Sequence, residues 1–221
     1  MFRFLLIALL ILGGQAATAQ TAPSAREIAV YDRVFKAAHH GDVAAIAKLA
    51  SEGADVDARD ATGRAPIHVA AFASQDDALR ALAEAGADMN ALDGQAYDVV
   101  TIAAVANDPD LMSLAIDLGN DPGLVTSPYD GTALIAAAHL GHAEVVRRLI
   151  AAGAPLDHVN NLHWTAVMEA VVLGDGGRNH QAVLDALLER FPIRWNRFRA
   201  NDFLPSSRSE DEGHAEHIRG Q

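Results

Sequence analysis

Apolar and polar positions along the chain recur with a period of about 33 residues. Four glycine-containing pairs mark the recurrence at spacings of 33, 33 and 34 residues, namely Gly53-Ala54, Gly86-Ala87, Gly119-Asn120 and Gly153-Ala154. Apolar residues at helical spacing precede each pair, as Leu79 and Leu82 do before Gly86. A short stretch with Asp or Asn follows, and then a second apolar block. Each period therefore predicts two short helices and a polar loop.

The residues at the ends of these blocks explain where the helices stop and start. A glycine after a helix adopts the left-handed conformation that other residues resist, so it ends the helix and turns the chain. The Thr132 and Thr165 hydroxyls can cap the next helix, and Pro66 fits a first helical turn. Small residues such as Ala136-Ala137-Ala138 allow close helix packing. Because no single period can bury its apolar face, stability is expected to come from stacked neighbours.

The order of parts resembles the ankyrin repeat, whose signature includes a Thr-Pro-Leu-His turn into the first helix. The second period keeps three features of that turn as Pro66, Ile67 and His68, and the resemblance runs from about Val30 to Arg190. It implies an all-α ankyrin-repeat solenoid of stacked helix-turn-helix units joined by β-hairpin loops. About five repeats are expected, over residues 26–58, 59–91, 92–124, 125–157 and 158–190, followed by a degraded C-terminal cap and tail at 191–221.

Several repeats depart from the pattern. The first is predicted to begin with a longer helix and to act as the N-terminal cap. The third reads Asp98-Val99-Val100-Thr101 where the turn motif belongs. The fifth carries an insertion around Gly174 to His180, which resembles one found in a group of bacterial ankyrin proteins. After Arg190 the pattern breaks, through either a degraded cap or a sequence error between Phe191 and Glu212.

The first residues have the organisation of a secretory signal peptide. A basic start is followed by nine apolar residues and by Ala17-Thr18-Ala19, a small-x-small cleavage site. Nine residues are about half the ~20 that a membrane-spanning helix needs, which disfavours the alternative of an anchor. Residues 1–19 are predicted to be removed, residues 20–25 to form a linker, and the mature chain to be periplasmic without stable membrane insertion. With no cysteine, its stability must come from packing alone.

Acidic residues outnumber basic ones, 29 to 17, giving a net charge of −12. From Ala81 to Val146 there is no Lys or Arg, whereas ten Asp and Glu residues occur. Such a surface repels nucleic acid and anionic membranes and would attract a partner with a basic surface. The alternative is that the acidic residues serve solubility and hairpin structure.

The residues that could support catalysis or metal binding lack a recognisable setting. His139 and His142 lie three apart, as His214 and His217 do, a spacing that could chelate a metal. His142 and His214 nevertheless occupy a repeat position at which histidine is typical of packing between repeats. No hydrolase elbow surrounds Ser127, and no phosphate-binding loop is present. The sequence therefore predicts no enzyme, no cofactor and no metal site.

Binding is expected at the loop tips, which with the first helices form the concave surface of an ankyrin array. By register the tips are residues 59–62, 92–95, 127–130 and 160–164. The candidate contact residues are Tyr97, Tyr129, Asp130, Asn161, His163 and Trp164. For Trp164 the alternative is packing between neighbouring loops. A basic-aromatic cluster from Arg194 to Arg199 could bind a nucleic acid or a membrane interface, or fold back on the array.

These observations predict a monomeric protein-protein interaction module of the periplasm. The first alternative is an exported effector that binds host proteins. A metal-assisted hydrolase is the remote alternative.

Overall fold

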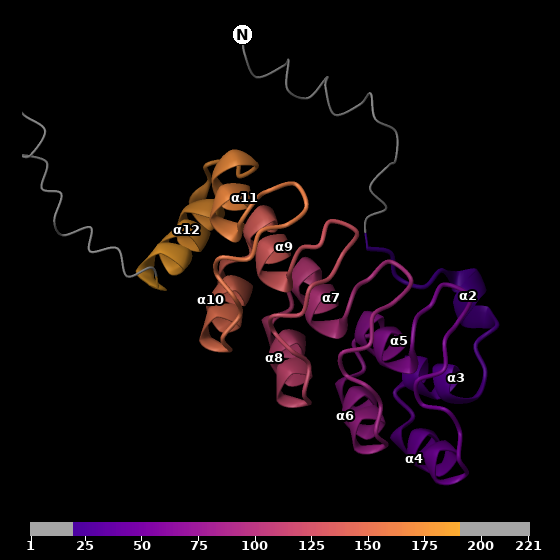
Figure 1. Ribbon diagram of the computed structural model, residues 1–221. Coiled ribbons are helices and arrows are strands. Elements are labelled where there is room, and N and C mark those ends of the chain that lie inside the picture. The colour runs from indigo at the N-terminus through magenta and orange to yellow at the C-terminus, as the bar shows by residue number, and fades with distance from the viewer. Residues whose placement is uncertain (1–19, 191–221) are drawn as a thin grey trace, which may run out of the picture. The chain divides into compact units, whose positions relative to one another are not determined.

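The computed structural model describes residues 20–190 of the 221-residue chain. Within this range the chain is helical, and Figure 1 shows the helices following one another in pairs. The described helices are α2 (Ala25–Ala29), α3 (Arg33–His40), α4 (Val43–Ser51), α5 (Pro66–Phe72), α6 (Asp76–Glu84), α7 (Val99–Ala106), α8 (Pro109–Asp117), α9 (Ala133–Leu140), α10 (Ala143–Ala151), α11 (Ala166–Val172) and α12 (Arg178–Arg190).

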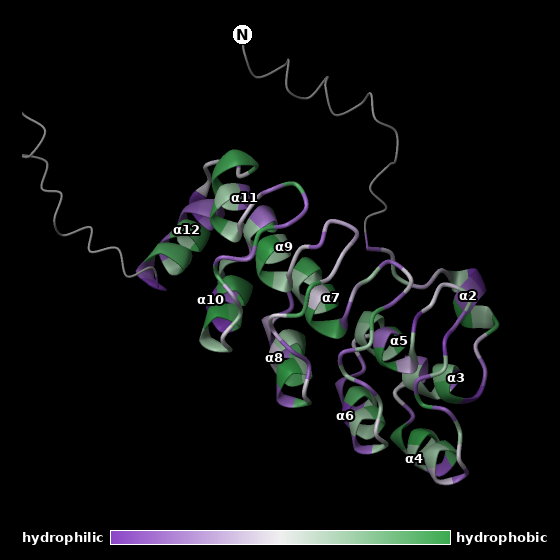
Figure 2. Cartoon of the chain, viewed as in Figure 1, coloured by the Kyte–Doolittle hydropathy of each residue, from purple (hydrophilic) through white to green (hydrophobic). Residues whose placement is uncertain are grey.

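The pairs stack so that equivalent helices touch. α3, α5, α7, α9 and α11 form one row, and α4, α6, α8, α10 and α12 form a second row against it. The core runs between the rows and consists mainly of Ala, Leu, Val and Ile. In Figure 2 the two central first helices, α7 and α9, are coloured hydrophobic over most of their length, because each is covered by a neighbour on both sides. The predicted stack of five helix-turn-helix units is confirmed.

The predicted glycine signal corresponds to a real backbone requirement. Gly53, Gly86, Gly119 and Gly153 follow the second helix of their repeats with φ values of 82°, 90°, 107° and 90°. These angles lie in the region that favours glycine. The predicted caps also form, since the Thr132 hydroxyl accepts the Ile135 amide at 3.4 Å and the Thr165 hydroxyl accepts the Met168 amide at 3.4 Å.

The start of the first repeat differs from the prediction of one longer helix. The chain forms two short helices, α2 and α3, separated by Val30 to Asp32. Ser24, which lies in the predicted linker, caps α2 through a capping box with Glu27, so the linker is bonded to the first helix. Asp32 is extended at φ −127° and ψ 173°, and a helix cannot continue through that conformation. The sequence interpretation of a single helix is therefore wrong.

The connecting loops are tight turns and not extended hairpins. The residues from 20 to 190 contain no β-strand, and one isolated bridge joins Thr126 to Gly131. Each turn closes on a short backbone pairing, as in the bond from the Asp60 amide to the Arg64 carbonyl at 2.9 Å. That pairing is too short to make a strand.

His68 joins the second repeat to the third from a fully buried position. Its Nδ1 accepts the Ala65 amide at 3.0 Å, and its Nε2 donates toward the Ala91 and Tyr97 carbonyls at 2.9 and 3.1 Å. One nitrogen accepts and the other donates, so the bonding requires the neutral ring. Burial lowers the pKa of His68 below 6.5.

The third repeat replaces that histidine with a different buried network. The Asp98 carboxylate caps α7 by accepting the Thr101 amide at 2.8 Å, and it also accepts the Asn120 side-chain amide at 2.8 Å. The Asn120 side-chain oxygen accepts the Val100 amide at 3.2 Å. Burial raises the pKa of Asp98. The repeat that departs most from the sequence pattern is therefore stabilised by its own set of polar groups.

His68→Ala should lower the free energy of unfolding by about 2–4 kcal/mol at pH 8, since each buried group left without a partner costs about 1–3 kcal/mol. The pKa of His68 is lower in the folded chain than its ordinary 6.5, so its contribution is present above 6.5 and is lost as the pH falls below 6.5. The gap between wild type and variant should therefore narrow at pH 5.5. Urea unfolding followed by circular dichroism at both pH values tests this, and a gap independent of pH would contradict it.

Candidate interaction surface

The tips of the four connecting loops share one construction. At each tip a single side-chain oxygen accepts the backbone amides two and four residues further on, at distances of 2.8–3.4 Å. The residues that supply this oxygen are Asp60, Asp93, Ser127 and Asn160, which recur every 33 or 34 residues. Asp and Asn side chains stabilise turns by this kind of bonding. We call these four residues the tip acceptors.

The residue between these two amides turns the backbone through the left-handed region. It is the third residue after the tip acceptor, and φ is 77° at Gly63, 61° at Ala96, 51° at Asp130 and 65° at His163. Asn, Asp and His tolerate this region better than most residues. Two predicted contact residues, Asp130 and His163, therefore have a defined backbone role as well as an exposed side chain.

Neighbouring tips are hydrogen-bonded to each other through the backbone. Three amide-to-carbonyl bonds of 3.2, 2.6 and 2.9 Å make the connection, from Gly94 to Thr62, from Ser127 to Ala96 and from Asn161 to Tyr129. The Arg59 guanidinium adds a bond to the Leu92 carbonyl at 2.6 Å. The four tips thus form a connected row, which would hold exposed side chains at fixed spacings.

Most of the predicted contact residues come together on the last two tips. Asn161 donates its backbone amide to the Tyr129 carbonyl and its side-chain amide to the Pro128 carbonyl at 3.2 Å. Tyr129 is 39% exposed, and Asp130, Asn161 and His163 are also exposed. His158 approaches the Asp130 carbonyl at 2.7 Å and adds a further link between the two tips.

The other two candidates are less accessible. Trp164 is partly buried, and its amide is held by the Asn160 tip acceptor at 2.9 Å. Tyr97 is 9% exposed, which leaves little of its side chain for a partner. It directly precedes Asp98, the buried N-cap residue of α7. Burial and the nearby Asp93 carboxylate raise the pKa of Tyr97.

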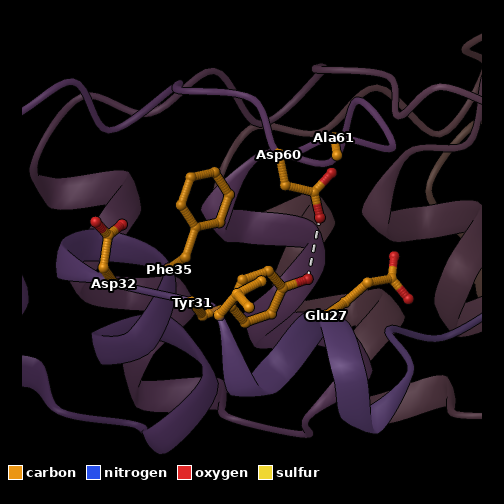
Figure 3. A pocket seen from close by; sticks show the side chains of 7 residues that line it. Glu27, Tyr31, Asp32, Phe35, Asp60 and Ala61 are labelled. Atoms are coloured by element: carbon orange, nitrogen blue, oxygen red, sulfur yellow. Dashed lines mark hydrogen bonds between the residues drawn. The ribbon is translucent and has the colours of Figure 1, made fainter.

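A cavity of about 230 Å³ opens beside the first tip (Figure 3). It is lined by Glu27, Val30, Tyr31, Asp32, Phe35, Asp60 and Ala61. The Tyr31 and Phe35 rings stack with centroids 5.6 Å apart, and the Tyr31 hydroxyl donates to Asp60 at 3.0 Å. Burial raises the pKa of Tyr31 to about 12. Sequence analysis did not identify this cavity, because Tyr31 lies in the break between α2 and α3, which the sequence pattern did not predict.

Two of the three cavity carboxylates, those of Glu27 and Asp60, pair with a largely buried arginine. Arg64 donates to Glu27 at 2.8 Å and to the Thr21 carbonyl at 2.8 Å, and it lies 3.7 Å from Asp60. The Ser24 hydroxyl and amide, together with Arg64, lower the pKa of Glu27 to about 2. Three carboxylates against one guanidinium leave the lining negative, and aromatic rings also attract cations. The cavity chemically suits a basic side chain.

Seven of the ten acidic residues between Ala81 and Val146 bond to a backbone amide or pair with an arginine. Asp88, Asp93, Asp98, Asp108 and Asp121 each accept a backbone amide in a turn or at a helix start. Asp110 and Glu144 both pair with Arg148, at 2.8 and 3.1 Å. The acidity of this segment therefore reflects loop and cap geometry as well as surface charge.

The histidines considered for a metal have other partners. His142 contacts the Ala104 carbonyl at 2.8 Å and so links the fourth repeat to the third, while His139 contacts the buried Glu169 at 3.1 Å. Over residues 20–190 no three His, Cys, Asp or Glu side chains are grouped as a metal site would require. His214, His217 and the basic-aromatic cluster at 194–199 lie outside the described residues.

Paired helices stacked in two rows, with a connected row of tips, define a helical repeat protein. The chain belongs to the ankyrin repeat family, because ankyrin repeats match residues 9–93 and 100–198. It is 37% identical over 62 residues to the ankyrin repeat protein YahD of Escherichia coli (strain K12), a match that covers 28% of this chain and 31% of YahD. The crystal structure of an ankyrin repeat domain from Acinetobacter baumannii AYE is similar with a TM-score of 0.65 and 40% identity, covering 71% of this chain and 79% of that one.

Ankyrin repeats are in general protein-protein interaction modules, and the family is typically not enzymatic. The match to YahD spans about a third of that protein. In the part of the chain that the structure covers, no helix has the length and apolar character needed to cross a membrane.

Proposed function

We propose that this protein binds a partner protein through the row of tips and the adjoining first helices, and that it does so as a monomer. The observation that carries the proposal is the direct bonding of one tip to the next. A surface whose backbone is already fixed loses little conformational freedom when it binds, so its side chains can contribute more fully to affinity. Tyr129 provides an exposed aromatic side chain on that fixed backbone.

The charge of the surface favours a partner with a basic patch. Asp130 is an exposed carboxylate on the third tip, and the cavity beside the first tip adds Asp32 and Asp60. Oppositely charged surfaces accelerate association and select among partners. A basic side chain of the partner would fit the negatively charged aromatic cavity, while the same charges would disfavour nucleic acid.

Tyr129→Ala combined with Trp164→Ala should weaken partner binding at least about tenfold while leaving the helical circular dichroism unchanged, since truncating an aromatic anchor commonly costs more than 1 kcal/mol. The chain from residue 20 onward serves as bait in a periplasmic extract, and the captured protein is then titrated by calorimetry. Equal affinity for wild type and the double variant would refute the tips as the binding face.

A matched pair of charge variants tests the electrostatic part of the proposal. Asp130→Asn and Asp117→Asn each remove one exposed carboxylate, but Asp130 lies on a tip and Asp117 at the end of α8. Asn also tolerates the positive φ of residue 130. Only Asp130→Asn should slow association and reduce its salt dependence.

We also propose that the protein acts after export, in the periplasm, with an effector that binds host proteins as the alternative. The support is the order of a basic start, an apolar run and a small-residue cleavage site in residues 1–19. The protein recovered by osmotic shock should begin at Gln20, as measured by intact-mass spectrometry. Full-length protein confined to the cytoplasmic fraction would contradict export. Specific capture of host proteins, with nothing captured from the periplasm, would favour the effector.

A further inference from the structure

The insertion in the fifth repeat carries a contact that the proposed function does not use. Residues 173–177 connect α11 to α12, and His180 lies in the first turns of α12. His180 Nε2 lies 3.0 Å from the His139 carbonyl at the end of α9, and Nδ1 lies 2.9 Å from the Asp175 carboxylate in the insertion. The ring thus connects the insertion to the preceding repeat, across 41 residues of sequence.

The two partners of the ring determine its protonation. A backbone carbonyl and a carboxylate both only accept hydrogen bonds, so both ring nitrogens must donate for both contacts to form. The charged imidazolium has two N–H groups, whereas the neutral ring has one. Deprotonation therefore turns one of the two contacts into a repulsion between lone pairs.

The ring occupies a slot that two glycines make possible. A Cβ atom at Gly141 would lie 3.0 Å from the ring Cε1, and one at Gly174 would lie 2.9 Å from Cδ2 and closer still to the Ala170 carbonyl oxygen. The His180 side chain is 12% exposed in this slot. The close fit holds the ring nitrogens against their two acceptors.

Few charged or titratable side chains lie near the His180 ring. Asp175 is the ionisable group in direct contact with it and is itself fixed by the Gly177 amide, which donates to the same oxygen at 2.7 Å. From α9, the His139 side chain is engaged with Glu169, whose other oxygen accepts the Asn160 amide at 3.2 Å. The His139 carbonyl and the Asp175 carboxylate raise the pKa of His180 above 6.5, and the Gly177 amide and His180 lower the pKa of Asp175.

We propose that His180, Asp175 and the His139 carbonyl form a pH-dependent latch between the fourth and fifth repeats. The imidazolium closes the latch and the neutral ring releases it. Since the folded pKa of His180 is the higher one, the stabilisation is complete below pH 6.5 and is lost as the pH rises through the folded value. Release loosens the insertion and the start of α12 while the tips keep their own bonds.

The latch is tested on the chain from residue 20 onward by nitrogen-15 NMR of the histidine rings and by amide hydrogen exchange. The His180 ring should titrate above 6.5, with both nitrogens protonated at pH 6. The Gly177 amide should lose protection, measured as a protection factor corrected for intrinsic exchange, across that titration.

Asp175→Asn keeps an oxygen for the Gly177 amide but removes the charge, so it should lower the pKa of His180 and move the loss of Gly177 protection to lower pH. His180→Gln should abolish the pH dependence of that protection. The control is His158→Gln, which alters a histidine on the fourth tip and should change neither quantity. A His180 pKa at or below 6.5, or an unchanged Gly177 profile in Asp175→Asn, would overturn the latch even if His180→Gln fails to fold.

Discussion

In each connecting loop one side-chain oxygen accepts two backbone amides, and the ordered tip surface depends on this interaction. Without it, the amides two and four residues beyond Asp60, Asp93, Ser127 and Asn160 would lose their partners within the turn. With it, each of the first three tips presents a carbonyl to the next tip, as Ala96 does to Ser127. Each tip is therefore a local turn that is stabilised further by its bond to the neighbouring tip, as nearest neighbours stabilise each other in a repeat array.

The helical stack beneath the tips is less uniform than its apolar core suggests. The second repeat uses the neutral ring of His68 to join its neighbour, while in the third Asp98 and Asn120 bond to each other within the repeat. The fifth repeat adds His180, whose two acceptors require the charged ring. Acidification should therefore weaken the junction at His68 and strengthen the one at His180. The two junctions respond to pH in opposite directions because one ring both donates and accepts and the other only donates.

The fold could be predicted because its signals are local and periodic. Gly53, Gly86, Gly119 and Gly153 each mark a helix end by their own conformational freedom, and Thr132 and Thr165 cap helices within three residues. The division between α2 and α3 was missed because the apolar pattern continues through Val30 to Asp32, and the extended conformation of Asp32 has no strong sequence signature. The tip acceptors were visible as recurring Asp, Ser and Asn, but that pattern did not show which amides they hold.

The surface could be predicted only in part, since exposure depends on long-range packing. Tyr129, Asp130, Asn161 and His163 are exposed on adjacent tips, as the register suggested. Tyr97 has a similar place in the register and is largely buried. The cavity at Tyr31 and the slot around His180 join residues 29 and 41 positions apart, and no single period of the sequence contains them.

The most direct test is amide hydrogen exchange at Ser127 in Asp93→Ala and Asp93→Asn. Asp93 is buried and accepts the Gln95 and Tyr97 amides, and the Ser127 amide of the next tip donates to the Ala96 carbonyl of the Asp93 turn. Asn keeps the accepting oxygen and Ala removes it. The account predicts faster exchange at both Tyr97 and Ser127 in Asp93→Ala and near-native exchange in Asp93→Asn. Native protection of Ser127 in Asp93→Ala would contradict the dependence of the tip row on its tip acceptors.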